Sequence, residues 1–182
     1  VDTAAREVWK AGSPASVADP IPPTSWRKSI RERIKLMKDR PSLRIGIPRV
    51  LNMYAYAPLF SAYLQSLGVP SENIVYSDFT TNEMYRAGSS RGSIDPCFPS
   101  KITIAHFHNL IYMKHVHKPL DCIFLPMFDV LCSPLVRTRA CNACPTVAVT
   151  PETVEAAYTK EIDVFAQHNI SYLHPLVNLS DR

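Results

Sequence analysis

Short apolar runs alternate with longer amphipathic segments along most of this chain. From residue 43 onward, runs rich in Ile, Val and Phe are bounded by Pro, Gly, Asn or Asp, which is typical of buried strands. They predict strands over residues 43–47, 73–77, 121–126, 147–149 and 170–173. Segments with apolar residues three or four positions apart predict helices over residues 58–67, 80–87, 99–116 and 151–168.

Residues at the predicted helix ends support these boundaries. Pro58 falls near the first turn of one helix and Gly68 follows its end, where a glycine commonly closes a helix. Thr150 precedes the helix over residues 151–168, and its side-chain oxygen is expected to cap that helix. The helix over residues 99–116 is apolar nearly all round, so we expect it to be buried.

The order of these elements predicts an α/β fold. Strands separated by helices favour right-handed crossovers and a parallel sheet, which gives a Rossmann-like three-layer sandwich. Ligands of such sheets gather beyond the carboxyl ends of the strands. We therefore expect the functional edge of the sheet to be formed by the segments that follow Ile47, Ser77, Pro126 and Thr150.

Residues 1–42 differ in character from the rest. Residues 11–25 are rich in Pro and small polar residues and are expected to form a linker or wrapping arm. A basic helix follows, capped by Thr24 or Ser25 and running to about Asp39, with Ile30, Ile34 and Met37 as its apolar stripe. We expect two parts: an arm and helix over residues 1–42, leading in from a preceding domain, and a Rossmann-like domain over residues 43–182. The chain is thus expected to be a piece of a longer protein.

The net charge of +4 has a local origin. Residues 1–40 hold nine Lys and Arg against five Asp and Glu, whereas residues 41–182 hold eleven of each. The cations of the basic helix are Arg27, Lys28, Arg31, Arg33, Lys35 and Lys38. They form either a solvated helix face or a phosphate-binding surface, and no nucleic-acid-binding motif accompanies them, so we expect no nucleic-acid partner.

The composition is that of a soluble globular protein. Apolar residues make up 46% and charged residues 20% of the chain. No uncharged apolar stretch reaches the roughly 18 residues that a membrane-spanning helix needs, so we expect a cytoplasmic protein without a membrane partner. All five cysteines lie between residues 97 and 144, and their odd number favours reduced thiols or metal ligands over a disulfide framework.

The first candidate site residue is Cys97, in the segment Cys97-Phe-Pro-Ser-Lys101. This thiol directly precedes a predicted helix, and the unpaired N–H groups there attract the negative charge of a metal-bound or reactive sulfur. Lys101 adds positive charge about one turn later. The alternative is a buried structural thiol beside a Pro-rich turn.

A second group of cysteines lies on the predicted connection between residues 126 and 147. It consists of Cys132 and the C-x-x-C pair Cys141 and Cys144, followed by Pro145. Such a pair can hold one metal ion or one iron–sulfur cluster, and Cys-Pro is typical of ferredoxin ligand runs. Zinc sites and redox dithiols use the same spacing, although a strand predicted after Pro145 argues against a redox dithiol, which normally opens a helix.

Several other polar residues lie near the cysteines in the sequence. The cations are Arg86, Arg91, Lys101, Arg137 and Arg139. They are either solvated or stabilise an anionic cluster or an acidic partner. His106 and His108 cannot chelate one ion from a regular helix, because two-residue spacing points their side chains in nearly opposite directions, so we interpret them as core or capping groups. Cys122 lies in an apolar strand and is expected to be a buried hydrophobic residue.

The order of short motifs from residue 43 to 178 resembles one known family. The matching residues are Arg44-Ile-Gly-Ile-Pro-Arg-Val-Leu-Asn-Met-Tyr54, Tyr76-Ser77, Thr80, Gly88, Cys97-Phe-Pro-Ser-Lys101, His108, Leu110, Asp121-Cys-Ile-Phe-Leu-Pro126, Cys144-Pro145 and Pro151. They resemble the uncharacterised domain of large CoA-substrate-specific enzyme activases, proteins similar to the activators of 2-hydroxyacyl-CoA dehydratases and benzoyl-CoA reductases.

This resemblance implies a part in ATP-driven, low-potential electron transfer in an anaerobe. It implies actin-like ATPase and dehydratase-like domains as partners, and a 4Fe-4S cluster on Cys97 and Cys144, with Cys141 and Cys132 as weaker candidates. The chain holds no nucleotide-binding glycine motif, so we expect it not to hydrolyse ATP by itself. Two alternatives stay open: a scaffold domain with structural cysteines or zinc, and a domain that binds acyl-CoA or another phosphate-bearing ligand.

Overall fold

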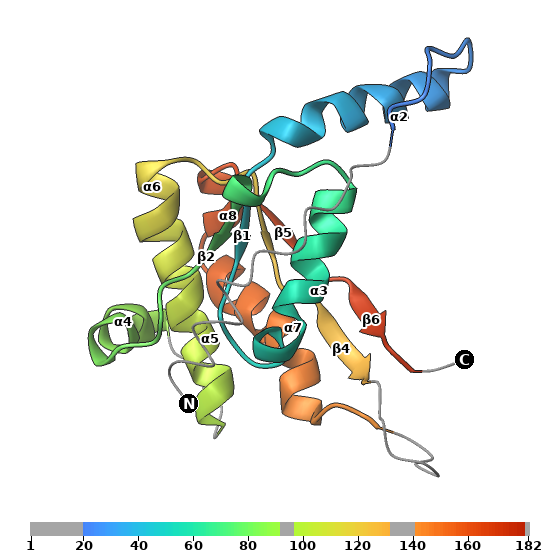
Figure 1. Cartoon of the computed structure of the whole chain (residues 1–182). Helices are drawn as coiled ribbons and strands as arrows, with labels where there is room; N and C mark the ends of the chain where they lie inside the picture. The colour runs from blue at the N-terminus through green and yellow to red at the C-terminus, as the bar shows by residue number, and fades with distance from the viewer. Residues whose placement is uncertain (1–19, 92–96, 132–140, 181–182) are drawn as a thin grey trace. The chain divides into compact units, whose positions relative to one another are not determined.

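The structure is a computed structural model that describes residues 20–91, 97–131 and 141–180 (Figure 1). Its strands are β1 (Ile45–Ile47), β2 (Ile74–Tyr76), β3 (Cys122–Phe124), β4 (Met127–Val130), β5 (Ser171–Leu173) and β6 (Leu176–Asn178). Its α-helices are α2 (Lys28–Asp39), α3 (Met53–Ser66), α4 (Asn82–Gly88), α5 (Phe98–Asn109), α6 (His115–His117), α7 (Pro145–Thr159) and α8 (Val164–Gln167). Short 3₁₀ turns are η1 (Arg40–Ser42), η2 (Ser71–Asn73) and η3 (Ser89–Arg91), and η4 (Leu110–Lys114) is a π-helical turn.

The central sheet has the strand order β2-β1-β3-β5 and is mainly parallel. Strands β3 and β5 pair in parallel, with Ile123 opposite Tyr172. From β1 the chain continues to β2, which lies at one edge of the sheet. It later forms β3 and β5 on the other side of β1. The α/β fold with a mainly parallel sheet, predicted from the sequence, is therefore confirmed, and the strand order reverses between β1 and β3.

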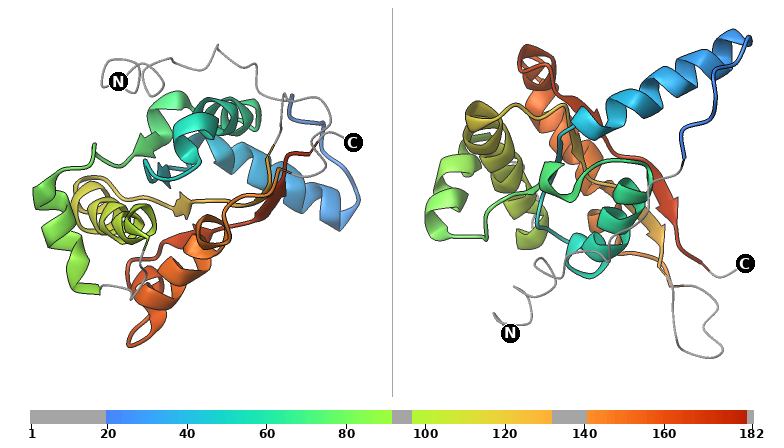
Figure 2. Two further views of the ribbon diagram at one scale, coloured as in Figure 1. Left: turned by 90° about the horizontal axis from the view of Figure 1, so that it is seen from below. Right: turned by 45° about the horizontal axis from the view of Figure 1, so that its top comes forward.

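A second, two-stranded parallel sheet extends from the ends of β3 and β5. It pairs β4 with β6, with Phe128 opposite Val177, and the two strands lie side by side in Figure 1 and in the right-hand view of Figure 2. Both strands were missed by the sequence pattern, because β4 begins only two residues after β3 and β6 only two residues after β5, so each looks like the end of the preceding apolar run.

The chain divides into two compact units. The first comprises the described residues up to Ile45 together with Tyr54–Val75. Within this unit, Arg40 Nη1 donates a hydrogen bond to the carbonyl of Leu67 (3.1 Å), and Asn73 Nδ2 donates to the carbonyl of Pro41 (3.0 Å). The second unit comprises Gly46–Met53 and the described residues from Tyr76 onward. The predicted division between residues 42 and 43 stays a prediction.

Helix α2 is the basic helix predicted from the sequence. Ile34 and Met37 are buried, as its apolar stripe predicted. The helix begins at Lys28 rather than after Thr24 or Ser25, so the predicted cap is wrong. Ser25 Oγ instead accepts a hydrogen bond from the N–H of Arg27 (3.3 Å), a local turn that competes with helix formation at these residues.

The core of the second unit is built around Phe107 on α5. Its ring lies 5.1 Å from that of Tyr172 and 6.1 Å from that of Tyr158, measured between centroids. The hydroxyl of Tyr158 donates to the carbonyl of Ile104 (3.0 Å), so this buried polar atom has a partner. The predicted burial of the helix over residues 99–116 is confirmed for α5, but not for the end of its continuation through η4 into α6, where Met113 and Val116 are exposed.

The segment after Cys144 departs most from the sequence prediction. Residues 147–149 lie inside α7 and not in a strand, because a short apolar run cannot distinguish a strand from a buried helix. Thr150 is therefore not a helix cap: its hydroxyl donates to the carbonyl of Thr146 (2.6 Å) within the helix. The single helix predicted over residues 151–168 is in fact interrupted, and Asp163 caps the short α8 by accepting from the N–H of Ala166 (2.9 Å).

No helix within residues 20–91, 97–131 or 141–180 is both long enough and apolar enough to cross a lipid bilayer.

Candidate functional site

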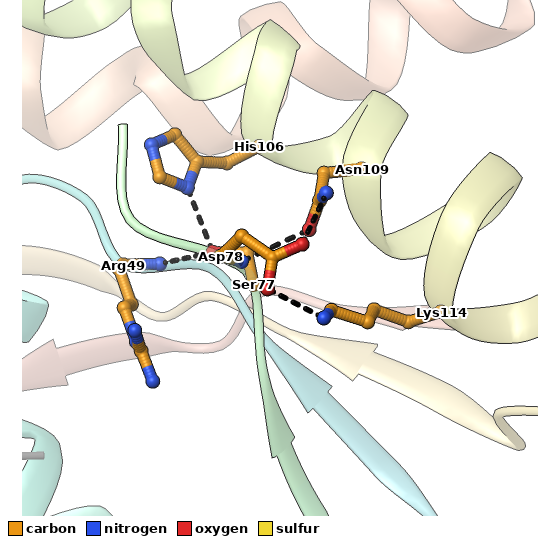
Figure 3. A network of polar contacts seen from close by, with 6 residues as sticks. All are labelled: Arg49, Ser77, Asp78, His106, Asn109 and Lys114. Atoms are coloured by element: carbon orange, nitrogen blue, oxygen red, sulfur yellow. Dashed lines mark hydrogen bonds and ion pairs between the residues drawn. The ribbon is translucent and has the colours of Figure 1, made fainter. Parts of the chain in front are cut away.

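The loops that follow β1 and β2 are joined directly to each other. The N–H of Ser77 donates to the carbonyl of Ile47 (3.1 Å), which continues the strand pairing by one residue. The hydroxyl of Ser77 then accepts from the N–H of Arg49 (2.8 Å) (Figure 3). Ser77 is fully buried, so these bonds fix the edge of the sheet where ligands of parallel α/β proteins gather.

His106 on α5 holds this loop pair to the helix. Its Nδ1 lies 2.7 Å from the Ser77 hydroxyl and its Nε2 lies 2.9 Å from the Thr80 hydroxyl. A neutral imidazole fits two hydroxyls, because it accepts from one and donates to the other. Burial, assisted by the charge of Arg49, lowers the pKa of His106 to about 4, so the ring is neutral at pH 7. The interpretation of His106 as a core histidine is confirmed.

Asp78, the next residue along the loop, forms three hydrogen bonds with the side chains of Asn109 and Lys114 (Figure 3). Its N–H donates to Asn109 Oδ1 (3.0 Å), and its carboxylate accepts from Asn109 Nδ2 (2.9 Å) and from Lys114 Nζ (2.5 Å). Partial burial by itself would raise the pKa of Asp78, but the hydrogen bonds from Lys114 and Asn109 lower it below the ordinary value. Asp78 is therefore a carboxylate at neutral pH.

Lys114 reaches Asp78 from the π-helical turn η4, and this ion pair is partly exposed. Replacing Lys114 with methionine is expected to lower the free energy of unfolding by about 0.5–1 kcal/mol, the usual range for a solvent-screened pair. Urea unfolding of Lys114→Met, Asp78→Asn and the double variant isolates the pair energy. Lys160→Met is the control, because Lys160 and its neighbour Glu161 are exposed and 3.9 Å apart. If the coupling energy between Lys114 and Asp78 is no larger than the change in unfolding free energy caused by Lys160→Met, the ion pair between Lys114 and Asp78 is contradicted.

Two cysteines directly precede neighbouring helices. Cys97 occupies the N-cap position of α5, and Cys144 occupies that of α7. The side-chain oxygens of Ser100 and Thr150 lie 2.9 Å apart, and Tyr158 further along α7 bonds to Ile104 further along α5. The two helices therefore run in the same direction, and their N-termini lie at the same side of the unit. The sequence pattern predicted that a helix follows Cys97, but after Cys144 it predicted a strand where the structure has α7.

The backbone at Cys141 pairs with the end of β4. The carbonyl of Cys141 accepts from the N–H of Leu131 (2.8 Å), and the N–H of Ala143 donates to the carbonyl of Asp129 (2.9 Å). Asn142 forms an antiparallel bridge with Val130. The first residues of the C-x-x-C segment are thus extended.

The cysteines of the described residues do not by themselves complete a metal site. Within residues 20–91, 97–131 and 141–180 there is no group of three or more His, Cys, Asp or Glu side chains that could hold a metal ion. Cys132, Arg137 and Arg139 lie outside the described residues. Ligand roles for Cys97, Cys141 and Cys144 therefore stay predictions, as does a supporting role for Lys101 in the first turn of α5. No cysteine in the described part of the chain forms a disulfide.

Cys122 is a buried residue of β3, as predicted. Burial, with a smaller contribution from Asp121, raises the pKa of the Cys122 thiol to about 11, so it stays protonated and unreactive at neutral pH. It is therefore the natural control residue for any experiment on the other cysteines.

The model of the CoA enzyme activase uncharacterised domain matches residues 44–182. The chain belongs to this family. No curated protein and no solved structure matches it. In this activase domain the family match begins just after α2, so the basic helix precedes the matched region.

Sequence reasoning missed most of the polar network in the activase domain. It did predict that the segments after Ile47 and Ser77 would lie together beyond the ends of their strands, and they do; a function for this edge stays a prediction. The partners of Asp78 could not be found in the same way, because they depend on the register of α5 and on a π-helical turn that leaves no pattern in the sequence. The only signal was a polar pair, Ser77-Asp78, directly after a buried strand.

Proposed function

We propose that this activase domain takes part in low-potential electron transfer and that its cysteines hold an iron–sulfur cluster. Cys97 and Cys144 are the main proposed ligands, with Cys141 or Cys132 completing the set. When bound, such a cluster would supply one-electron redox chemistry. We further propose that ATP is hydrolysed by a separate actin-like domain and that a dehydratase-like domain accepts the electrons, because this chain has no nucleotide-binding glycine motif.

The observation that carries this proposal is the position of Cys97 and Cys144. Each thiol directly precedes one of two neighbouring helices that run in the same direction. The N–H groups at both helix N-termini attract negative charge, which suits an anionic metal–thiolate centre. Two thiols at the N-termini of neighbouring parallel helices are thus suitable ligands for the proposed cluster. The remaining ligands must come from Cys141 or from residues outside the described ranges.

In this proposal, the hydrogen-bond network around His106 fixes the position of α5. It ties α5 to the loops after β1 and β2 through the Ser77 and Thr80 hydroxyls. A helix that is held in this way presents its N-terminus, and hence Cys97, in a fixed position. Because a ligand set must be positioned before it can bind a metal tightly, the network supports the cysteines without contacting the proposed cluster.

The proposal is tested with three variants purified without oxygen. Cys97→Ser and Cys144→Ser are each expected to lose most of the iron and the visible absorption of the purified chain, whereas Cys122→Ala is expected to retain both. Circular dichroism establishes that each variant is folded. Equal iron content in all three variants would overturn the ligand assignment.

Two alternative functions appear as other outcomes of the same experiment. A folded chain that contains zinc and no redox signal would favour a scaffold domain. A chain without metal that binds acyl-CoA, with affinity that falls as salt is added, would favour recognition of a phosphate-bearing ligand. Each of these results counts against the iron–sulfur proposal.

A further inference from the structure

The outer side of β5 and β6 forms one continuous strand edge. β5 is an edge strand of the central sheet, and β6 follows it after two residues as the partner of β4 (Figure 1). The N–H of Leu125 donates to the carbonyl of Leu173 (3.0 Å). Two residues later, the N–H of Met127 donates to the carbonyl of Pro175 (2.9 Å). The pairing thus runs on from one sheet into the next, and residues 171–179 form a single extended segment.

The backbone groups of this segment face inward and outward in turn. In a strand, the N–H and C=O of one residue point to one side and those of the next residue point to the other. Ser171 donates inward to the carbonyl of Asp121 (2.9 Å), and Leu179 donates inward to the carbonyl of Val130 (2.8 Å). The outward-facing residues between them are therefore Tyr172, His174, Leu176 and Asn178. In the part of the chain that the structure describes, the N–H and C=O groups of these four residues have no hydrogen-bond partner.

This edge lacks the features that normally protect an edge strand. Charged side chains, or a proline that removes an outward N–H, usually prevent another strand from pairing. Residues 170–180 contain no Lys, Arg, Asp or Glu, and their one proline, Pro175, faces inward. The edge strand on the opposite side of the central sheet, β2, is three residues long and lies between Glu72 and Asp78. The β5–β6 edge is therefore the better template for a further strand.

Two large apolar side chains lie exposed along the same edge. Leu173 is 46% exposed and Leu176 is 67% exposed. They lie on opposite faces of the extended segment, because an odd number of residues separates them in position. Side chains on a newly paired strand would lie about 4.5–5.5 Å away on both faces, so an added strand would cover part of each leucine.

We propose that this edge pairs with the same edge of a second copy of the chain. The two segments would run antiparallel, with a two-fold axis passing beside Pro175. Tyr172 would then pair with Asn178 of the second copy, and His174 with its Leu176. The four outward residues form four hydrogen-bonded pairs that exchange two bonds each, so every outward N–H and C=O finds a partner. Pro175 falls at a position where no N–H is needed.

The side chains of the segment suit such self-pairing. A two-fold axis brings identical residues close together, so a charged side chain near the axis would be repelled by its own copy. Residues 170–180 carry no such charge. Leu173 would lie opposite Val177 of the second copy, which would cover it. The nearby carboxylate of Glu155 lies 3.4 Å from His174 Nε2 and is thus directed at the histidine of its own chain. The proposal goes beyond the iron–sulfur function and does not depend on it.

The first test is sedimentation-velocity ultracentrifugation of the full chain, with a reductant present so that no disulfide joins two copies. We expect a reversible change from the 20.4 kDa monomer to a dimer as the protein concentration rises through the micromolar range. Amide hydrogen exchange at low and high concentration then locates the interface. Exchange is expected to slow in the dimer at Tyr172, His174, Leu176 and Asn178. A monomer up to about 300 µM, or a dimer in which these four amides stay unprotected, would overturn the proposal.

Two variants with a matched control sharpen this test. Leu176→Pro removes an outward N–H that the monomer does not use, and is expected to weaken dimerisation by about tenfold or more. Leu176→Lys places two like charges about 7–8 Å apart across the axis and is also expected to weaken it. Val116→Lys is the control, because Val116 on α6 is 66% exposed and lies outside the edge. Circular dichroism establishes that each variant is folded. Equal dimerisation of Leu176→Lys and Val116→Lys would show that the edge is not the interface.

Discussion

Lowering the pH from 6.5 to about 4 is expected to remove about 3 kcal/mol from the free energy of unfolding, through His106 alone. The unfolded chain binds a proton at this histidine below about pH 6.5, whereas the buried ring stays neutral until about pH 4. Between these values the unfolded state holds more protons, so stability rises with pH. The contribution is complete above pH 6.5 and is lost as the pH falls.

The measurement is urea unfolding at several pH values between 7 and 4, with two variants as comparison. His106→Gln keeps a group that can hydrogen-bond to Ser77 and Thr80 but cannot be protonated, so its stability should vary less over this range. His117→Gln alters an exposed histidine and should behave like the unaltered chain. If His106→Gln shows the same pH dependence as His117→Gln, the burial of a neutral His106 is contradicted.

Replacing Gly88 with alanine is expected to lower the free energy of unfolding by about 2 kcal/mol. The new Cβ atom would lie 2.4 Å from the Cα atom and 2.8 Å from the Cβ atom of Ala105. These are backbone and near-backbone atoms that cannot rotate away, so α4 must move from α5, at a cost of about 3 kcal/mol. Better helix propensity returns at most about 1 kcal/mol.

Gly46→Ala provides the comparison for this prediction. Its new Cβ atom would meet side-chain atoms, the nearest being Leu120 Cδ1 at 3.0 Å and Ile123 Cγ1 at 3.3 Å. Side chains can adjust by a few tenths of an ångström, so a smaller loss is expected than at Gly88. Urea unfolding of both variants measures the two losses in the free energy of unfolding. A loss at Gly88 no greater than that at Gly46 would show that α4 does not pack on α5 as closely as the Gly88–Ala105 contact requires.

Much of the fold could be predicted because it depends on local patterns. The runs over residues 43–47, 73–77 and 121–126 are bounded by turn residues, and β1, β2 and β3 lie within them. Residues 147–149 were predicted wrongly because three apolar residues fit a strand and a buried helix equally well. The side of α7 that is buried depends on its packing against α5, and a local pattern carries no information on that contact.

The candidate site was predictable only in part. The position of Cys97 before a helix followed from the Pro-containing segment after it, and the structure confirms that helix. The hydrogen bonds of His106 and Asp78 join residues from 26 to 36 positions apart, and their pairing follows from the packing of α5 on the loop after β2. Distances of this kind arise from tertiary structure, so single-sequence reasoning could only mark these residues as polar groups near strand ends.

The most direct test of the proposed function is the iron and acid-labile sulfide content of the unaltered chain after purification without oxygen. We predict a brown protein with about four iron and four sulfide per chain, the content of one 4Fe-4S cluster. A colourless, folded protein with less than about one iron per chain would contradict it.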